Sequence, residues 1–105
     1  MDPVIISIVA AVGALTFIAT RVIYVTWLTF SKIGEIFQRI KKKTRVTKQD
    51  IGFITMSVNS DKCSHIGGIF NKNTGELKTD VPLQVDSLSS EVERELRKTG
   101  TILLT

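Results

Sequence analysis

Residues 4–30, VIISIVAAVGALTFIATRVIYVTWLTF, form an almost wholly apolar run with a single charged side chain, Arg21. A helix over this run would be about 40 Å long, and about 20 apolar residues suffice to cross a bilayer. Tyr24, Trp27 and Phe30 lie near its end, and aromatic rings collect at the headgroup boundary of a membrane. The run therefore predicts one N-terminal transmembrane helix, with the span proper over residues 4–25.

Charge is distributed unevenly on the two sides of this run, and the uneven distribution predicts how the span is oriented in the membrane. The whole chain has a net charge of +4, but residues 31–50 alone carry seven basic side chains against Glu35 and Asp50. Basic residues beside a span favour the cytoplasmic side. We therefore expect a single-pass membrane protein with a translocated N-terminus and a cytoplasmic C-terminal part.

Residues 31–43 carry the pattern of an amphipathic helix, because apolar side chains recur at i, i+3, i+4 and i+7. Together with Trp27 they predict an apolar face in the membrane interface, formed by Trp27, Ile33, Ile36, Phe37 and Ile40. The basic side chains of this segment predict contacts with anionic lipid headgroups; they are Lys32, Arg39, Lys41, Lys42, Lys43 and Arg45. The alternative is that the apolar face packs on the C-terminal residues. A nucleic-acid partner is less expected, since Phe37 is the only aromatic residue among these cations.

A second pattern runs along the predicted span with alternating spacings of three and four residues. Its members are Ser7, Ala10, Ala14, Phe17, Arg21, Tyr24 and Leu28. This spacing is typical of a helix pair, and small residues allow close approach of two helices in a bilayer. The stripe predicts a homo-oligomer or a partner protein bound through the span. The alternative is an ordinary lipid-facing surface from which Arg21 reaches the headgroups.

Residues 49–105 predict a small α+β module with the order β-β-β-α-β. Strands are expected over residues 51–58, 65–70, 76–81 and 101–105, because these stretches are rich in β-branched and apolar residues between turn signals. Pro82 is expected to end the third strand. A helix is expected from Ser89 or Ser90 to Thr99, with Ser90 and Glu93 spaced as a capping box and Gly100 at the C-cap. Glu93 and Arg97 are spaced to pair on that helix.

Chemistry-bearing motifs are few. Cys63 is the only cysteine and His65 the only histidine, so the chain has too few ligands for a zinc site of its own. Gly67-Gly68 continues into no phosphate-binding pattern and indicates a bulge or a close backbone approach. We therefore predict no catalytic, cofactor-binding or metal-binding residues, and no enzyme activity.

The sequence thus predicts three parts: an N-terminal tip and transmembrane helix over residues 1–30, a basic juxtamembrane segment and linker over 31–48, and the α+β module over 49–105. The expected function is to anchor that module to a membrane and engage protein partners, as a scaffold or accessory subunit of a membrane complex. An alternative follows from topology alone, which over about the first 45 residues looks like that of viroporins and plant-virus movement proteins. On that alternative the chain is a small viral membrane-active protein that acts by oligomerisation of its span.

Overall fold

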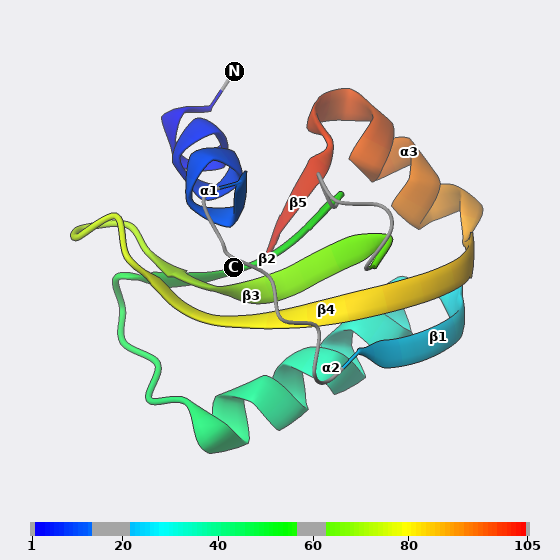
Figure 1. Cartoon of the computed structure of the whole chain (residues 1–105), viewed down its shortest axis with the longest axis horizontal. Helices are drawn as coiled ribbons and strands as arrows, with labels where there is room; N and C mark the ends of the chain where they lie inside the picture. The colour runs from blue at the N-terminus through cyan, green and yellow to red at the C-terminus, as the bar shows by residue number, and fades with distance from the viewer. Residues whose placement is uncertain (1, 14–21, 57–62, 105) are drawn as a thin grey trace.

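The computed structural model describes residues 2–13, 22–56 and 63–104 of the 105-residue chain. The helices and strands are α1 (Pro3–Gly13), β1 (Ile23–Leu28), α2 (Phe30–Lys43), β2 (Asp50–Met56), β3 (His65–Asn71), β4 (Leu77–Leu88), α3 (Ser90–Thr99) and β5 (Thr101–Leu104). Figure 1 shows them arranged around one twisted sheet.

The strands form a mixed sheet in the order β1-β4-β3-β2-β5. β1 runs parallel to β4, and the other neighbouring strands are antiparallel. The turn between β3 and β4 is held by Asn71, whose Oδ1 accepts hydrogen bonds from the amides of Asn73 and Thr74. Gly75 completes this turn with φ +72°, a conformation that glycine adopts without strain.

Helices cover both faces of the sheet. α1 lies above it in Figure 1 and buries Ile8 and Val12 against a cluster that includes Phe53, Ile66 and Phe70. α2 lies on the opposite side, where its apolar stripe joins the larger core cluster. α3 links β4 to β5 and adds Val92 and Leu96 to that same cluster. The core is therefore divided into two by the sheet.

The prediction of one transmembrane helix over residues 4–25 is wrong. α1 ends at Gly13, and residues 23–28 of the same apolar run form strand β1; residues 14–21 lie outside the described part of the chain. None of the helices in the described ranges has both the length and the apolar character needed to span a bilayer. An apolar run fits buried helices and strands as well as a span, and the β-branched and aromatic residues of IYVTWL favour a strand.

Three further predictions depended on that helix and are corrected with it. The fold is an α+β arrangement of helices on a mixed five-stranded sheet, not a span followed by a separate membrane-bound helix. The single-pass membrane localisation, with a translocated N-terminus and a cytoplasmic C-terminal part, loses its basis. The description as a membrane or viral protein loses its basis too, because the topology that looked like that of viroporins and movement proteins required that span.

The element order predicted for residues 49–105 is confirmed, with two corrections of detail. β4 continues past Pro82 to Leu88, where it is lengthened by parallel pairing with β1. The N-cap of α3 is Ser89, whose hydroxyl accepts a hydrogen bond from the amide of Val92, and not Ser90. The Glu93–Arg97 ion pair at 2.7 Å and the left-handed C-cap at Gly100 are confirmed.

Candidate interaction surface on helix α2

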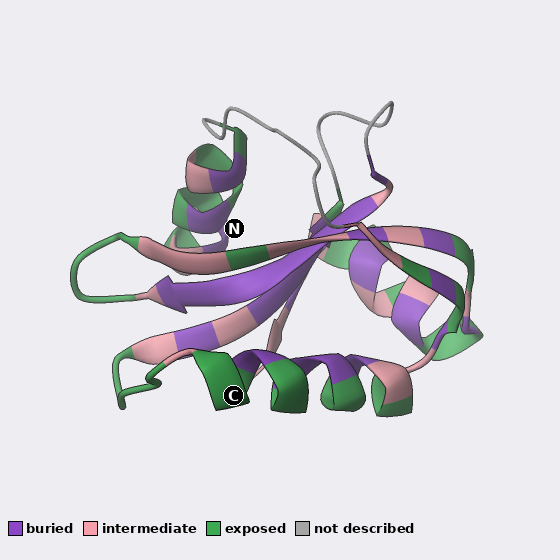
Figure 2. Cartoon of the chain, turned by 60° about the horizontal axis from the view of Figure 1, so that its bottom comes forward, coloured by how far each residue is buried: buried purple, intermediate pink, exposed green. Residues whose placement is uncertain are grey.

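The sequence of α2 determines where the helix begins, what charge its last turn carries and which of its sides is buried. The Thr29 hydroxyl caps its N-terminus by accepting a hydrogen bond from the amide of Lys32 at 3.0 Å, and the last turn holds Lys41, Lys42 and Lys43, where positive charge is favoured by the helix dipole. The apolar stripe of the helix is buried against the sheet. Figure 2 shows this division, with the buried side of α2 toward the sheet and the exposed side outward.

The outward side of α2 and the loop that follows it are strongly cationic. We define the α2 cationic surface as the exposed basic residues from Arg39 onward: Arg39, Lys41, Lys42, Lys43, Arg45 and Lys48. Within the described residues, none of these six makes an ion pair, since the only pair formed on α2 joins Lys32 to Glu35 at 3.3 Å. The positive charge of this surface is therefore left unneutralised.

A pocket of about 300 Å³ lies between α2 and the β2–β5 side of the sheet, and we call it the β5-side pocket. Its apolar lining includes Phe30, Phe37, Val46 and Leu104, and Lys41 contributes a cation. Gly52 makes room here, because a Cβ at this position would lie only 2.6 Å from the ring of Phe37.

A second pocket of about 360 Å³ lies on the other flank of α2, beside β1 and β4, and we call it the β1-side pocket. It combines apolar side chains with the cations Arg39 and Lys43 and one acid, Asp80. Both flanks of the helix therefore offer apolar surface next to positive charge.

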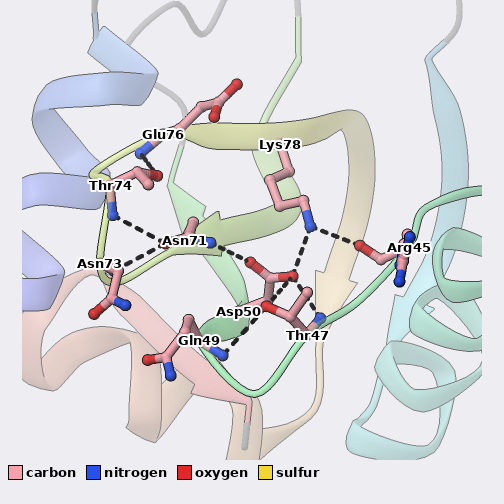
Figure 3. Close-up of polar contacts among 9 residues, drawn as sticks. All are labelled: Arg45, Thr47, Gln49, Asp50, Asn71, Asn73, Thr74, Glu76 and Lys78. Atoms are coloured by element: carbon pink, nitrogen blue, oxygen red, sulfur yellow. Dashed lines mark hydrogen bonds and ion pairs between the residues drawn. The ribbon is translucent and has the colours of Figure 1, made fainter.

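The loop after α2 is held in place by a buried carboxylate, Asp50, whose side chain is 0% exposed. Its Oδ2 accepts hydrogen bonds from Lys78 Nζ at 2.7 Å and from the Thr47 amide at 2.7 Å, and its Oδ1 accepts one from Asn71 Nδ2 at 3.1 Å. Lys78 Nζ also donates to the carbonyl oxygen of Arg45 at 2.6 Å. Figure 3 shows these contacts converging on Asp50 from Thr47 in the preceding loop, Asn71 on β3 and Lys78 on β4. They fix the backbone at Arg45 relative to the sheet.

The protonation of Asp50 reflects this arrangement. The hydrogen bond from the Lys78 ammonium holds the pKa of the carboxyl below its ordinary value, burial opposes this, and the hydrogen bonds from Thr47 add to the lowering. The carboxylate therefore stays charged near neutral pH and neutralises Lys78, and it leaves the α2 cationic surface unpaired.

The predicted interfacial face of α2 is not available to a membrane. Ile33, Ile36, Phe37 and Ile40 lie in the core against the sheet, which is the alternative that the sequence left open. Trp27 lies apart from them on β1 and is 61% exposed. The six residues predicted to contact headgroups all belong to α2 or the loop after it, and the assignment of lipid as their ligand stays a prediction.

The predicted helix-association stripe is not a stripe on one helix in the described residues. Ser7 and Ala10 lie exposed on α1, whereas Tyr24 and Leu28 belong to β1, where Tyr24 is 80% exposed and Leu28 is fully buried. The other predicted members, Ala14, Phe17 and Arg21, lie outside the described residues.

Cys63 and His65 are separated by the sheet. Cys63 is buried in the cluster under α1, and His65 lies in a pocket on the other side with residues of α3. The Nδ1 atom of His65 is 2.8 Å from the Ser64 hydroxyl, and burial lowers the pKa of the imidazole. Among residues 2–13, 22–56 and 63–104, no group of three or more His, Cys, Asp or Glu side chains could hold a metal ion.

Sequence reasoning did not anticipate the Asp50–Lys78 pair or the pockets beside α2. Asp50 and Lys78 are 28 positions apart and meet only because β2, β3 and β4 are neighbours. Gly52 could have indicated the β5-side pocket, since a glycine inside a strand often marks a close approach of another group.

No protein-family model matches this chain, and neither a curated protein nor a solved structure matches it.

Proposed function

We propose that this chain is a non-enzymatic interaction module whose α2 cationic surface binds an acidic segment of a partner protein. The observation that carries the proposal is the set of six exposed, unneutralised cations on and after α2, flanked on both sides by pockets with apolar lining. The helix already buries its whole apolar stripe in the core. Its outward side chains are therefore free to serve binding.

These cations are not explained by the stability of the fold. Lys41, Lys42 and Lys43 are adjacent in the sequence. Like charges repel one another when they lie within the screening length, which is about 8 Å at physiological salt. The helix dipole offsets this by only about 0.3–1 kcal/mol for each exposed charge near the helix end. An acidic ligand would relieve the repulsion, which is why the charge pattern favours a binding surface.

The pockets favour a protein ligand over other polyanions. The phosphate groups of nucleic acids and of lipid headgroups would match the cations but not the apolar lining of the pockets. An acidic peptide that also carries apolar side chains can use both features, for example Lys41 together with the lining of the β5-side pocket. The charge complementarity would supply a fast association rate and orientation, and the apolar contacts would supply specificity.

The direct test is fluorescence anisotropy of a labelled peptide of alternating Glu and Leu, titrated with the full chain at several salt concentrations. The variant Lys42→Gln/Lys43→Gln removes two cations from the surface. The matched control Lys72→Gln/Arg94→Gln removes two exposed cations from the β3–β4 turn and from α3. Because an exposed ion pair contributes about 0.2–1 kcal/mol, we expect the loss of two pairs to lower the affinity about 2- to 30-fold in the first variant, and the affinity to change little in the control.

Competing ligands are tested in the same assay with a single-stranded DNA of equal charge, a polyglutamate peptide and phosphatidylserine vesicles. The proposal expects the Glu-Leu peptide to bind more tightly than polyglutamate, because only the former can fill the pockets. Tighter binding of DNA or vesicles than of either peptide would overturn the assignment of a protein ligand. Equal losses in the two charge variants would show that net charge alone, and not the α2 surface, governs binding.

A further inference from the structure

β1 is an outer strand of the sheet and has one open edge. It pairs with β4 alone, and the carbonyl oxygen of Leu28 accepts a hydrogen bond from the amide of Ser89 on that side. Because backbone groups alternate in direction along a strand, those of Ile23, Val25 and Trp27 face away from β4. No strand in the described part of the chain pairs with them.

The sequence of β1 lacks the residues that normally protect an outer strand. Such strands are usually guarded by charged residues, proline or a covering element, but IYVTWL contains no charged residue and no proline. Tyr24 is 80% exposed and Trp27 is 61% exposed, and they are the two most exposed large apolar side chains among the described residues. β1, which lies at one edge of the sheet in Figure 1, therefore presents exposed aromatic rings together with backbone groups that no strand of the described residues pairs.

We propose that β1 pairs antiparallel with β1 of a second copy of this chain, with the twofold axis near Val25. The outward backbone groups of Ile23 then meet those of Trp27 in the second copy, and Val25 meets its own equivalent. This arrangement leaves no charge at the seam, and it joins two five-stranded sheets into one continuous sheet. The edge is thus complementary to itself, which is the requirement for a twofold interface.

The exposed rings supply much of the area that such a dimer needs. An aromatic side chain buries about 150–250 Å², and the two copies together offer four of them, against a requirement of about 1,200 Å² for a stable interface. The remaining area comes from the paired backbones. A dimer would also place two α2 cationic surfaces in one particle, although the dimer itself does not depend on the proposed ligand.

Sedimentation velocity of the full chain over a wide concentration range tests the proposal. We expect a reversible monomer–dimer equilibrium that Tyr24→Lys and Trp27→Lys each weaken by about tenfold or more, because each change acts twice in a symmetric interface. The matched control is Ile6→Lys, which replaces a 53% exposed apolar side chain on α1 and should leave the equilibrium unchanged. Circular dichroism confirms that each variant is folded.

Two readouts on the unaltered chain make the test independent of the variants. Trp27 is the only tryptophan, so its emission should shift to shorter wavelength as the dimer forms and buries the ring. The amides of Ile23, Val25 and Trp27 should gain protection from hydrogen exchange at the same concentrations. A chain that stays monomeric throughout, or a dimer that both lysine variants leave intact, would overturn the proposal.

Discussion

Gly68→Ala is expected to destabilise the fold strongly, whereas the same change at the adjacent Gly67 should be tolerated. A Cβ on Gly68 would clash with the carbonyl oxygen of Thr79 and would lie 2.9 Å from Cζ of Phe53. Neither neighbour can yield easily. Thr79 belongs to β4 and is paired with Ile69 of β3, and Phe53 is 0% exposed. At Gly67 the nearest atom, Cδ1 of Ile54, would be 3.4 Å away, which is ordinary contact.

The expected changes in the free energy of unfolding follow from the surroundings of Gly68 and Gly67. Overpacking a well-packed core costs about 1–3 kcal/mol and sometimes more, and replacing glycine by alanine within a strand returns about 0.5–1 kcal/mol. We expect Gly68→Ala to lose about 2 kcal/mol, which is a large part of the roughly 5–15 kcal/mol that holds a protein folded. Gly67→Ala should change the free energy of unfolding by less than about 1 kcal/mol.

Urea unfolding followed by far-ultraviolet circular dichroism measures both variants against the unaltered chain. The expected result is a lower midpoint for Gly68→Ala, with an unchanged dependence on urea, and a nearly unchanged midpoint for Gly67→Ala. Equal midpoints for the two variants would refute the reasoning, because that result would mean that the Phe53 ring and the β4 backbone do not enclose Gly68 as described.

Three further changes test other parts of the fold. Gly34→Ala on the exposed side of α2, where a Cβ would meet nothing within 4 Å, should raise the free energy of unfolding by about 0.5–1 kcal/mol in a thermal melt. Ser89→Ala removes the N-cap of α3 and should cost about 1 kcal/mol, whereas Ser90→Ala should cost little, and equal losses would contradict the capping assignment. Burial lowers the pKa of His65 below its ordinary value near 6.5, so the unfolded chain binds more protons below that pH. The melting temperature should therefore fall as the pH is lowered from about 7.5 to about 5.5, and His65→Gln should flatten this dependence.

The elements of residues 49–105 could be predicted because each carries a local signal. The strands are short apolar stretches between turn residues, and α3 is bounded by a serine and by Gly100, which adopts φ +79°. Of the bulge or close backbone approach predicted at Gly67-Gly68, the close approach is confirmed at Gly68, where the Thr79 carbonyl oxygen and the Phe53 ring lie against the glycine. The amphipathic pattern of α2 also predicted a helix over the right residues.

The candidate interaction surface was harder to predict, because a periodic pattern shows that a helix has an apolar face but not what that face contacts. A lipid interface and a sheet both bury Ile33, Ile36, Phe37 and Ile40, and only the tertiary structure decides between them. This decision changes which side chains of α2 are available for binding. On a sheet the same helix presents its cations around pockets, and the apolar residues that would have anchored it in lipid are used for folding.

The N-terminal apolar run was misread for a related reason, and β3 contains the information that corrects it. Every residue from His65 to Phe70 is buried, and a strand that is buried along its whole length must be covered on both faces of its sheet. A module with a single helix covers only one face, so the predicted β-β-β-α-β unit would have left either the Phe53 and Phe70 side or the Ile54 and Ile69 side in water. The uncovered face therefore requires a further apolar element, and in the described residues α1 covers the Phe53 and Phe70 side while α2 packs with α3 on the other. The continuous apolar character of HIGGIF thus argues for an N-terminus that packs on the sheet.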